Sequence, residues 1–188
     1  EPIVSDLTTR FIVPGKTLAE ISKLLKEEDE EAYLALSQKH IVFRIGGYYV
    51  VSRLLEGEFL DYNAAIPKVS KTTVKINTRS LTDAVERTSL LISDRLRSPI
   101  RLSAMDQKVQ LNCSTSMGKA HDEVDCEMSG EAVSMGFNNK YLMDALKASD
   151  CDMVKLEING ALSPMRILPL EGESFLFLVL PVRVKNDD

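Results

Sequence analysis

A short pattern recurs three times along this chain. Each occurrence places a basic residue, a spacer, a leucine and a second apolar residue at the start of an amphipathic stretch: Lys16-Thr-Leu18-x-x-Ile21, Arg79-Ser-Leu81-x-x-Ala84 and Lys140-Tyr-Leu142-x-x-Ala145. The leucines recur about every 60 residues, and self-similarity at a nearly fixed period indicates copies of one supersecondary unit. The chain is therefore predicted to fold as three copies of one unit.

Each copy predicts a strand, a helix and three further strands. Apolar residues spaced three and four apart predict the helices, and short runs rich in β-branched residues predict the strands. The first helix is expected to bury one face, formed by Leu18, Ile21, Leu24 and Leu25. Asn77 or Thr78 is the expected cap of the second helix and Asn138 that of the third. Gly46-Gly47 predicts a tight hairpin turn.

The expected strands follow the same order in every copy. They are 9–13, 32–36, 40–45 and 48–54 in the first copy, 73–76, 100–104, 109–113 and 123–128 in the second, and 132–137, 153–158, 163–168 and 175–184 in the third. The polar residues 114–122 are expected to form a flexible excursion between two strands of the second copy.

The repeat predicts the class and the domain organisation. One helix on a few short strands cannot bury its own sheet, so copies are expected to pair into an α+β fold with helices on one side of antiparallel sheets. Residues 68–188 contain two copies and are predicted to be a complete domain. Residues 1–67 contain one copy and are predicted to be half of another domain.

The last predicted strand, Phe175–Val184, needs cover on both faces. Six consecutive apolar residues precede Pro181, whereas a half-solvated strand alternates apolar and polar residues. Pro181 cannot donate a ladder hydrogen bond, so it is expected at a sheet edge or a domain boundary. There the apolar side chains can form a groove instead of a sealed core.

Composition and motifs argue against several classes of function. The net charge of −5 disfavours binding of nucleic acid by bulk basicity but allows a locally positive face. No nucleophile–base pair, phosphate-binding glycine loop or paired-acid motif is present, and neither His40 nor His121 lies at a catalytic spacing. His121 adjoins an acidic loop that is more simply interpreted as solvated than as a metal site.

Basic residues recur at equivalent helical positions. Lys16, Arg79 and Lys140 begin the three helices, and Lys23 and Lys147 lie two turns after the first and third of them. Such a row suits long-range attraction to phosphates without base readout. Solvated lysines on helices are also common, and spacing alone favours that interpretation.

Four motifs occur in an order that resembles one known family. They are Ile12-Val-Pro-Gly-Lys16, Gly57-Glu-Phe-Leu-Asp-Tyr62 with Ile66-Pro-Lys68, Gly136-Phe-Asn-Asn-Lys-Tyr141, and Leu180-Pro-Val-Arg183. Together with the repeat they resemble the bacterial sliding clamps, the beta subunits of DNA polymerase III, from about residue 9 to residue 184.

The resemblance implies a DNA-clamp fold and a ring. Family members have three domains, each a pair of units, and two chains close head to tail around duplex DNA, with the helices lining the hole. Residues 1–67 would then be the second half of the middle domain and residues 68–188 the C-terminal domain. The row of Lys16, Lys23, Arg79, Lys140 and Lys147 would face DNA, and Leu90 and Leu91 would lie at the subunit interface. This chain alone is not expected to close the ring.

The resemblance implies that the protein is a processivity factor in the cytoplasm, a non-catalytic subunit of a nucleotidyltransferase complex. It also implies no cofactor, no metal and no membrane contact. Partners such as the polymerase III alpha subunit, the clamp loader, other polymerases and repair proteins insert a short peptide into an apolar groove. By resemblance the groove would use Leu60, Ala65, Asn138, Tyr141, Leu162, Pro164, Leu178, Leu180, Pro181, Val182 and Arg183. The family often has proline at the place of Leu60 and a larger aliphatic residue at that of Ala65.

Two other classes of function are compatible with the residues alone. An enzyme on the same repeat could use residues 114–123 as an active-site lid, although no nucleophile–base pair supports it. A structural scaffold would leave the lysine row and the terminal strand without ligands.

Overall fold

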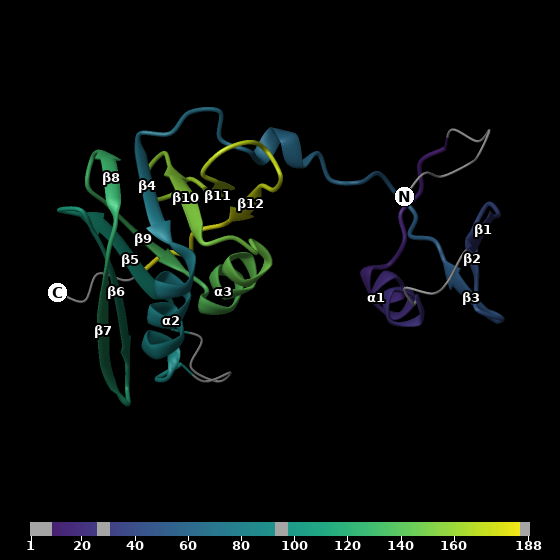
Figure 1. Ribbon diagram of the computed structural model, residues 1–188, viewed down its shortest axis with the longest axis horizontal. Coiled ribbons are helices and arrows are strands. Elements are labelled where there is room, and N and C mark those ends of the chain that lie inside the picture. Colours follow the sequence, from purple (N-terminus) through teal and green to yellow (C-terminus); the bar gives the residue numbers. More distant parts are fainter. Residues whose placement is uncertain (1–8, 26–30, 93–97, 185–188) are drawn as a thin grey trace. The chain divides into compact units, whose positions relative to one another are not determined.

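The computed structural model describes residues 9–25, 31–92 and 98–184, and the chain divides into two compact units. The first unit is Glu1–Leu60 and the second unit is Asp61–Asp188. Figure 1 shows a small helix and sheet in the first unit and two sheets with two helices in the second unit. The division falls between residues 60 and 61, a few residues before residue 68, where the predicted complete domain begins.

The first unit has one helix and one antiparallel sheet. Helix α1 (Gly15–Leu24) is followed by β1 (Ala32–Leu36), β2 (His40–Ile45) and β3 (Tyr48–Arg53), in the sheet order β1-β2-β3. The predicted hairpin turn at Gly46 and Gly47 has positive φ at both residues, which only glycine adopts readily. The expected first strand reduces to a single bridge between Ile12 and Leu55.

Only part of the predicted helical face in the first unit is buried. Ile21 is buried against β2 and Leu24 is half-buried, but Leu18 and Leu25 are 50% and 47% exposed. Every residue of β1 is exposed as well. The expectation that Leu18 and Leu25 are core residues is therefore wrong for this unit, because one helix and three strands cover each other on one side only.

The second unit builds the larger core from two sheets and two helices. It begins with the short 3₁₀ turn η1 (Tyr62–Ala65), β4 (Thr72–Asn77) and α2 (Thr78–Ser89). The remaining elements are β5 (Ile100–Met105), β6 (Lys108–Thr115), β7 (Gly118–Asp125), β8 (Glu127–Gly130), β9 (Val133–Phe137), α3 (Asn139–Ala148), β10 (Met153–Ile158), β11 (Met165–Pro169) and β12 (Phe177–Val179). The sheet orders are β12-β11-β10-β4-β8 and β7-β6-β5-β9.

The two copies in the second unit exchange their first strands. Strand β4 opens the second copy but pairs with β10 of the third, over the register from Met153↔Asn77 to Ile158↔Thr72. Strand β9 opens the third copy but pairs with β5 of the second, from Ile100↔Phe137 to Ala104↔Val133. Neither sheet can form from one copy, which is the structural reason that the copies pair.

Each copy also ends by returning to its own first strand. In the second copy β8 pairs with β4, in the third Val182 bridges to Gly136, and in the first Leu55 bridges to Ile12. In the second unit these returning segments complete the exchanged sheets. In the first unit the corresponding edges, at β1 and at Ile12, have no partner strand within the described part of the chain.

Two expected features of the second unit are wrong. Residues 114–122 are not an excursion, because β6 and β7 form a long hairpin with register from Lys108↔Asp125 to Thr115↔Gly118. This segment is polar because β7 is an edge strand that is half-buried at alternate residues. The last strand is also shorter than expected: β12 ends at Val179, and past Pro181 the chain passes to the other sheet at Val182.

Packing of both sheets against α2 and α3 gives one continuous core. Leu81, Ala84 and Val85 of α2 and Leu142 and Leu146 of α3 are buried in it together with Phe137. The side chain of Asn77 caps α2 by accepting from Ser80 N at 2.9 Å, as predicted. In the described part of the chain, no helix has the length and apolar composition that crossing a membrane requires.

Candidate functional site

An apolar groove of about 570 Å³ lies between α3 and the C-terminal segment. Tyr141, Asp144, Ala145 and Ala148 form its helical wall, and residues 176–182 form the opposite wall. Tyr141 is 62% exposed and Leu180 is 63% exposed, so two large side chains at the groove are open to solvent. Exposed apolar surface in a concave site is typical of a binding surface.

Local sequence explains both walls. Asn138 caps α3, its side chain accepting from Lys140 N at 3.0 Å, and this fixes the start of the helix. The spacing from Tyr141 to Asp144, Ala145 and Ala148 then places these residues on one side of α3. On the other wall, Pro181 follows the end of β12, and Val182 N donates to Gly136 O at 2.8 Å.

The structure brings together only part of the predicted groove. Tyr141, Leu178, Leu180, Pro181 and Val182 line it. Six other predicted residues do not line it: Asn138 is the helix cap, Leu162 is exposed, Pro164 is half-buried before β11, Arg183 lines a different cavity, and Leu60 and Ala65 are exposed on either side of the division between the units.

Several lining residues were missed by the sequence analysis. They are Asp144, Ala145 and Ala148 on α3 and Leu176, Phe177 and Val179 on the terminal segment. Helical spacing from Tyr141 contained the signal for the first three. The other three belong to the apolar run that the sequence had already singled out.

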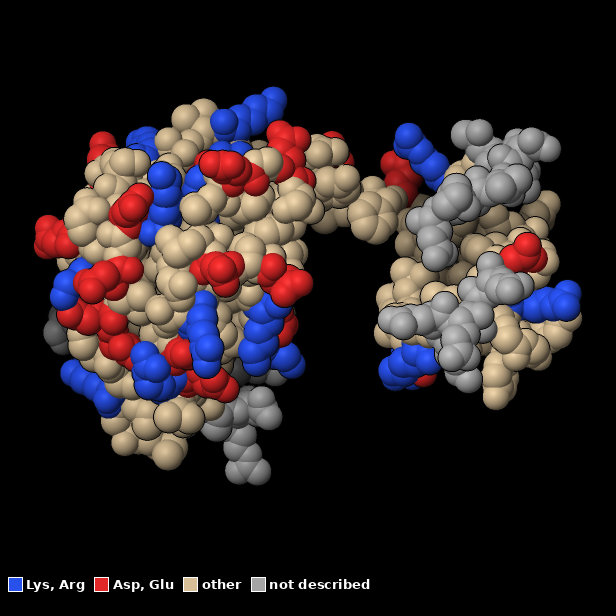
Figure 2. Space-filling model, in the orientation of Figure 1, with Lys and Arg blue, Asp and Glu red and all other residues tan. Residues whose placement is uncertain are grey.

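The predicted basic residues are exposed, but acidic residues accompany them. Lys16, Arg79, Lys140 and Lys147 lie on the exposed sides of their helices, and Lys23 pairs with Glu20 at 2.8 Å. Figure 2 shows Lys and Arg interspersed with Asp and Glu on the face of the second unit that carries α2 and α3. In the second unit the helical surface is therefore of mixed charge and not a purely positive row.

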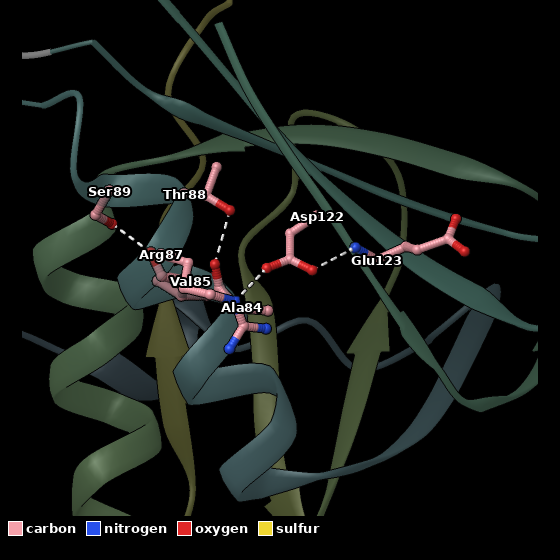
Figure 3. A network of polar contacts seen from close by, with 7 residues as sticks. All are labelled: Ala84, Val85, Arg87, Thr88, Ser89, Asp122 and Glu123. Carbon is pink, nitrogen blue, oxygen red and sulfur yellow. Dashed lines mark hydrogen bonds and ion pairs between the residues drawn. The ribbon is translucent and has the colours of Figure 1, made fainter.

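The C-terminal end of α2 is fastened to β7. Arg87 Nε donates to Asp122 Oδ2 at 2.7 Å, and Asp122 Oδ1 accepts from Glu123 N at 2.9 Å (Figure 3). The hydrogen bond from Arg87 holds the pKa of the Asp122 carboxyl below its usual range. Just beyond, Leu90 is 79% exposed and Leu91 is half-buried.

This ion pair predicts an acid-sensitive contact. The pKa of Asp122 is lower in the folded state than in the unfolded chain, where it is about 3.9. The ion pair therefore stabilises the fold fully above about pH 3.9, and this stabilisation is lost as the pH falls through the pKa that Asp122 has in the folded state. We expect Asp122→Asn to lower the thermal midpoint slightly at pH 6, and the difference from the parent chain to shrink as the pH falls below about 3.9. Circular dichroism melts over this pH range measure the difference, and Asp152→Asn, at an exposed carboxylate that has no ion pair among the described residues, is the control. A difference that stays constant as the pH falls below about 3.9 would contradict the assignment.

The described residues contain no group of three or more His, Cys, Asp or Glu side chains close enough to hold a metal ion. Nor does any feature of the groove require one, since its walls are mainly apolar. An open groove with mainly apolar walls suits reversible docking of an apolar segment.

Comparison with known proteins assigns both units to one family. Residues 63–183 match the model for the C-terminal domain of the DNA polymerase III beta subunit, and residues 2–61 match the model for its central domain. The chain belongs to the DNA polymerase III beta subunit family. The α+β clamp fold with antiparallel sheets, predicted from the sequence, is confirmed by solved structures of this family.

Relatives within the beta subunit family show how much of a full-length protein is present. The chain is 34% identical to the beta sliding clamp of Staphylococcus aureus over 174 residues, which cover 92% of this chain and 46% of the relative. The DNA polymerase sliding clamp of Bacillus subtilis aligns with a TM-score of 0.87 at 30% identity, over 97% of this chain and 49% of that one. A Bartonella birtlesii sliding clamp solved with bound griselimycin aligns with a TM-score of 0.84 at 29% identity, over 93% and 47%. The chain thus spans about half the length of these relatives.

Proposed function

We propose that this chain is the C-terminal portion of a sliding clamp, a processivity factor that tethers DNA polymerase and other replication and repair proteins to DNA. Family membership of both units supports this proposal. The observation that carries it is the apolar groove between α3 and residues 176–182, which can hold the apolar anchors of a partner peptide. The Bartonella relative, which binds griselimycin, shows that a family member accommodates a ligand.

The partner peptides belong to proteins of the replication machinery. In this proposal they come from the DNA polymerase III alpha subunit, the clamp loader, other polymerases and repair proteins. The clamp itself acts in the cytoplasm as a non-catalytic subunit of the polymerase complex. Of the groove residues expected from the sequence, the five that line the groove are the first to test; Leu60 and Ala65 would contribute only in the full-length protein.

The edges at β1 and Ile12, which have no partner strand among the described residues, support a larger parent domain. The second unit shows that each copy lends its first strand to another copy, and β1 lies where such a strand would pair. The first unit is accordingly proposed to be the second half of a middle domain, and residues 68–188 the C-terminal domain. Exposed Leu34 and Leu36 of β1 would be covered by the preceding copy in the full-length protein.

In the full-length protein two chains would close head to tail around duplex DNA. Leu90 and Leu91 at the end of α2 are proposed to contact the other subunit, and the exposed apolar surface of Leu90 is consistent with this. Lys16, Lys23, Arg79, Lys140 and Lys147 are proposed to face DNA phosphates. Because acidic residues lie among them, we propose loose, sequence-independent contact, which suits sliding.

Peptide titration tests the groove directly. A fluorescent peptide with leucine and phenylalanine anchors is expected to bind this chain, with reduced affinity because the middle domain is incomplete. Leu180→Asp places a charge on an apolar wall and is expected to abolish detectable binding. Tyr141→Ala removes an exposed aromatic side chain and is expected to weaken binding at least tenfold, about 1.4 kcal/mol. Fluorescence anisotropy measures both.

A matched control uses an apolar residue that is similarly exposed but lies outside the groove. Met117, in the turn between β6 and β7, is 71% exposed and does not line the groove. Met117→Asp should leave peptide binding unchanged. Binding that is unaffected by Leu180→Asp and Tyr141→Ala would remove the groove assignment.

A further inference from the structure

A second cavity, of about 980 Å³, lies on the outer face of the sheet β7-β6-β5-β9, opposite the core. We call it the basic pocket. Arg101, Lys119, His121 and Arg183 line it, and among the described residues no Asp or Glu side chain does. Two polar contacts order its floor: His121 Nδ1 and Asn112 Oδ1 are 2.8 Å apart, and Ser103 Oγ and Ser134 Oγ are 2.9 Å apart.

Several cations of the second unit are engaged by carboxylates, but among the described residues two cations of the basic pocket, Lys119 and Arg183, are not. Arg87 pairs with Asp122, Lys75 pairs with Glu127, and Glu157 lies between Lys155 and Arg166. In contrast, neither Lys119 nor Arg183 has a carboxylate within salt-bridge distance in the described part of the chain. The next carboxylate on this face of β7, Glu123, is engaged by Lys108. On a chain of net charge −5 this is a local positive site.

The basic pocket adjoins the groove through the main chain. Pro181 and Val182 line the groove, and the next two residues, Arg183 and Val184, line the basic pocket. The hydrogen bond from Val182 N to Gly136 O, 2.8 Å long, fixes the chain between the two sites. An extended peptide covers about 3.3 Å per residue, so an acidic flank that reaches the basic pocket must be long enough to pass around this segment of the chain.

We propose that the basic pocket receives an acidic segment of the same partner peptide whose apolar anchors occupy the groove. The proposal rests on the proposed function of the groove. It adds that the residues flanking the apolar anchors of the partner peptide are acidic. Lys119 and Arg183 would attract the carboxylates, and the serine hydroxyls can donate hydrogen bonds to them. A peptide is favoured over a nucleic acid because the adjoining groove is mainly apolar and takes side-chain anchors.

The experiment compares peptides that share one apolar core. One peptide carries four glutamates before the core, a second carries them after it, and two matched peptides carry glutamines instead. Each is titrated by fluorescence anisotropy against the parent chain, Lys119→Gln, Arg183→Gln and the control Lys71→Gln. Lys71 is exposed, lines neither site, and its variant has the same net charge as the other two.

We expect one glutamate peptide to bind the parent chain about tenfold more tightly than its glutamine counterpart at low salt. This gain should fall at least threefold in Lys119→Gln and in Arg183→Gln, persist in Lys71→Gln, and shrink between about 0.05 and 0.3 M salt. Loss of the gain in Lys71→Gln as well would show general attraction and overturn the proposal.

Two further outcomes separate the alternatives. Binding of a single-stranded oligonucleotide that competes with the acidic flank and is lost in Lys119→Gln would make the basic pocket a nucleic-acid site and overturn the peptide proposal. Failure of the glutamine peptides to bind the parent chain would instead overturn the groove function. Equal affinity of glutamate and glutamine peptides for the parent chain would overturn the acidic flank alone.

Discussion

Replacement of Gly136 by alanine is expected to detach the C-terminal segment from β9 and to weaken peptide binding at least tenfold. A Cβ atom at this position would lie 2.1 Å from Val184 Cγ2 and 2.6 Å from the main-chain oxygen of Val182. Real Cβ atoms do not approach so closely, and a main-chain oxygen cannot move aside without the chain. The segment that forms one wall of the groove and one side of the basic pocket must therefore shift.

The effect on binding follows from what the segment does. Displacement breaks the hydrogen bond from Val182 N to Gly136 O and moves Pro181 and Val182, which line the groove. A tenfold loss of affinity corresponds to about 1.4 kcal/mol, and the crowding itself should cost about 1–3 kcal/mol of stability. Peptide anisotropy measures the first quantity and urea unfolding the second.

Gly15 provides the matched control for Gly136. No atom lies within 4 Å of a Cβ built there, and its φ is not in the left-handed region, so Gly15→Ala should change neither binding nor stability by more than about 0.5 kcal/mol. Hydrogen exchange of β4, β5 and β10 shows whether the core of Gly136→Ala remains folded. Unchanged peptide affinity in a folded Gly136→Ala variant would show that the terminal segment does not form the binding wall.

The same glycine illustrates what the sequence could and could not predict. The repeat, the cap at Asn138 and the hairpin at Gly46-Gly47 are local patterns that were predicted, and the cap at Asn77 was one of two predicted candidates. The close approach of Gly136 to Val182 joins residues far apart in the chain, and no local pattern encodes it. The exchange of β4 and β9 between copies is non-local for the same reason.

The sequence predicted only part of the groove for a similar reason. The apolar run before Pro181 marked one wall, because an apolar strand without polar alternation needs a second partner. The helical wall depends on which side of α3 faces that run, and only packing decides this. Likewise the first part of β7 was missed, and the predicted strand 123–128 spans the end of β7 and the start of β8. An edge strand with a polar face lacks the apolar alternation that marks half-buried strands.

The repeat itself predicts equivalence at Leu18, Leu81 and Leu142, and the structure shows that it does not hold. Leu81 and Leu142 are fully buried in the core that the two paired copies form. Leu18 is 50% exposed, because the first unit contains only one copy. Leu81→Ala is therefore expected to lower the free energy of unfolding of the second unit by about 2–5 kcal/mol. Leu18→Ala should cost the first unit less than about 1 kcal/mol, since Leu18 is half exposed and the substitution removes little buried apolar surface.

Hydrogen exchange followed by mass spectrometry resolves the two units and so measures both changes in the same chain. Leu162→Ala, at a residue that is 76% exposed in the second unit, controls for the substitution itself and should have little effect. In a full-length protein that supplies the preceding copy, Leu18 would become buried and Leu18→Ala should then cost as much as Leu81→Ala. Equal, small effects of Leu18→Ala in the short and full-length chains would contradict the pairing of the first unit with another copy.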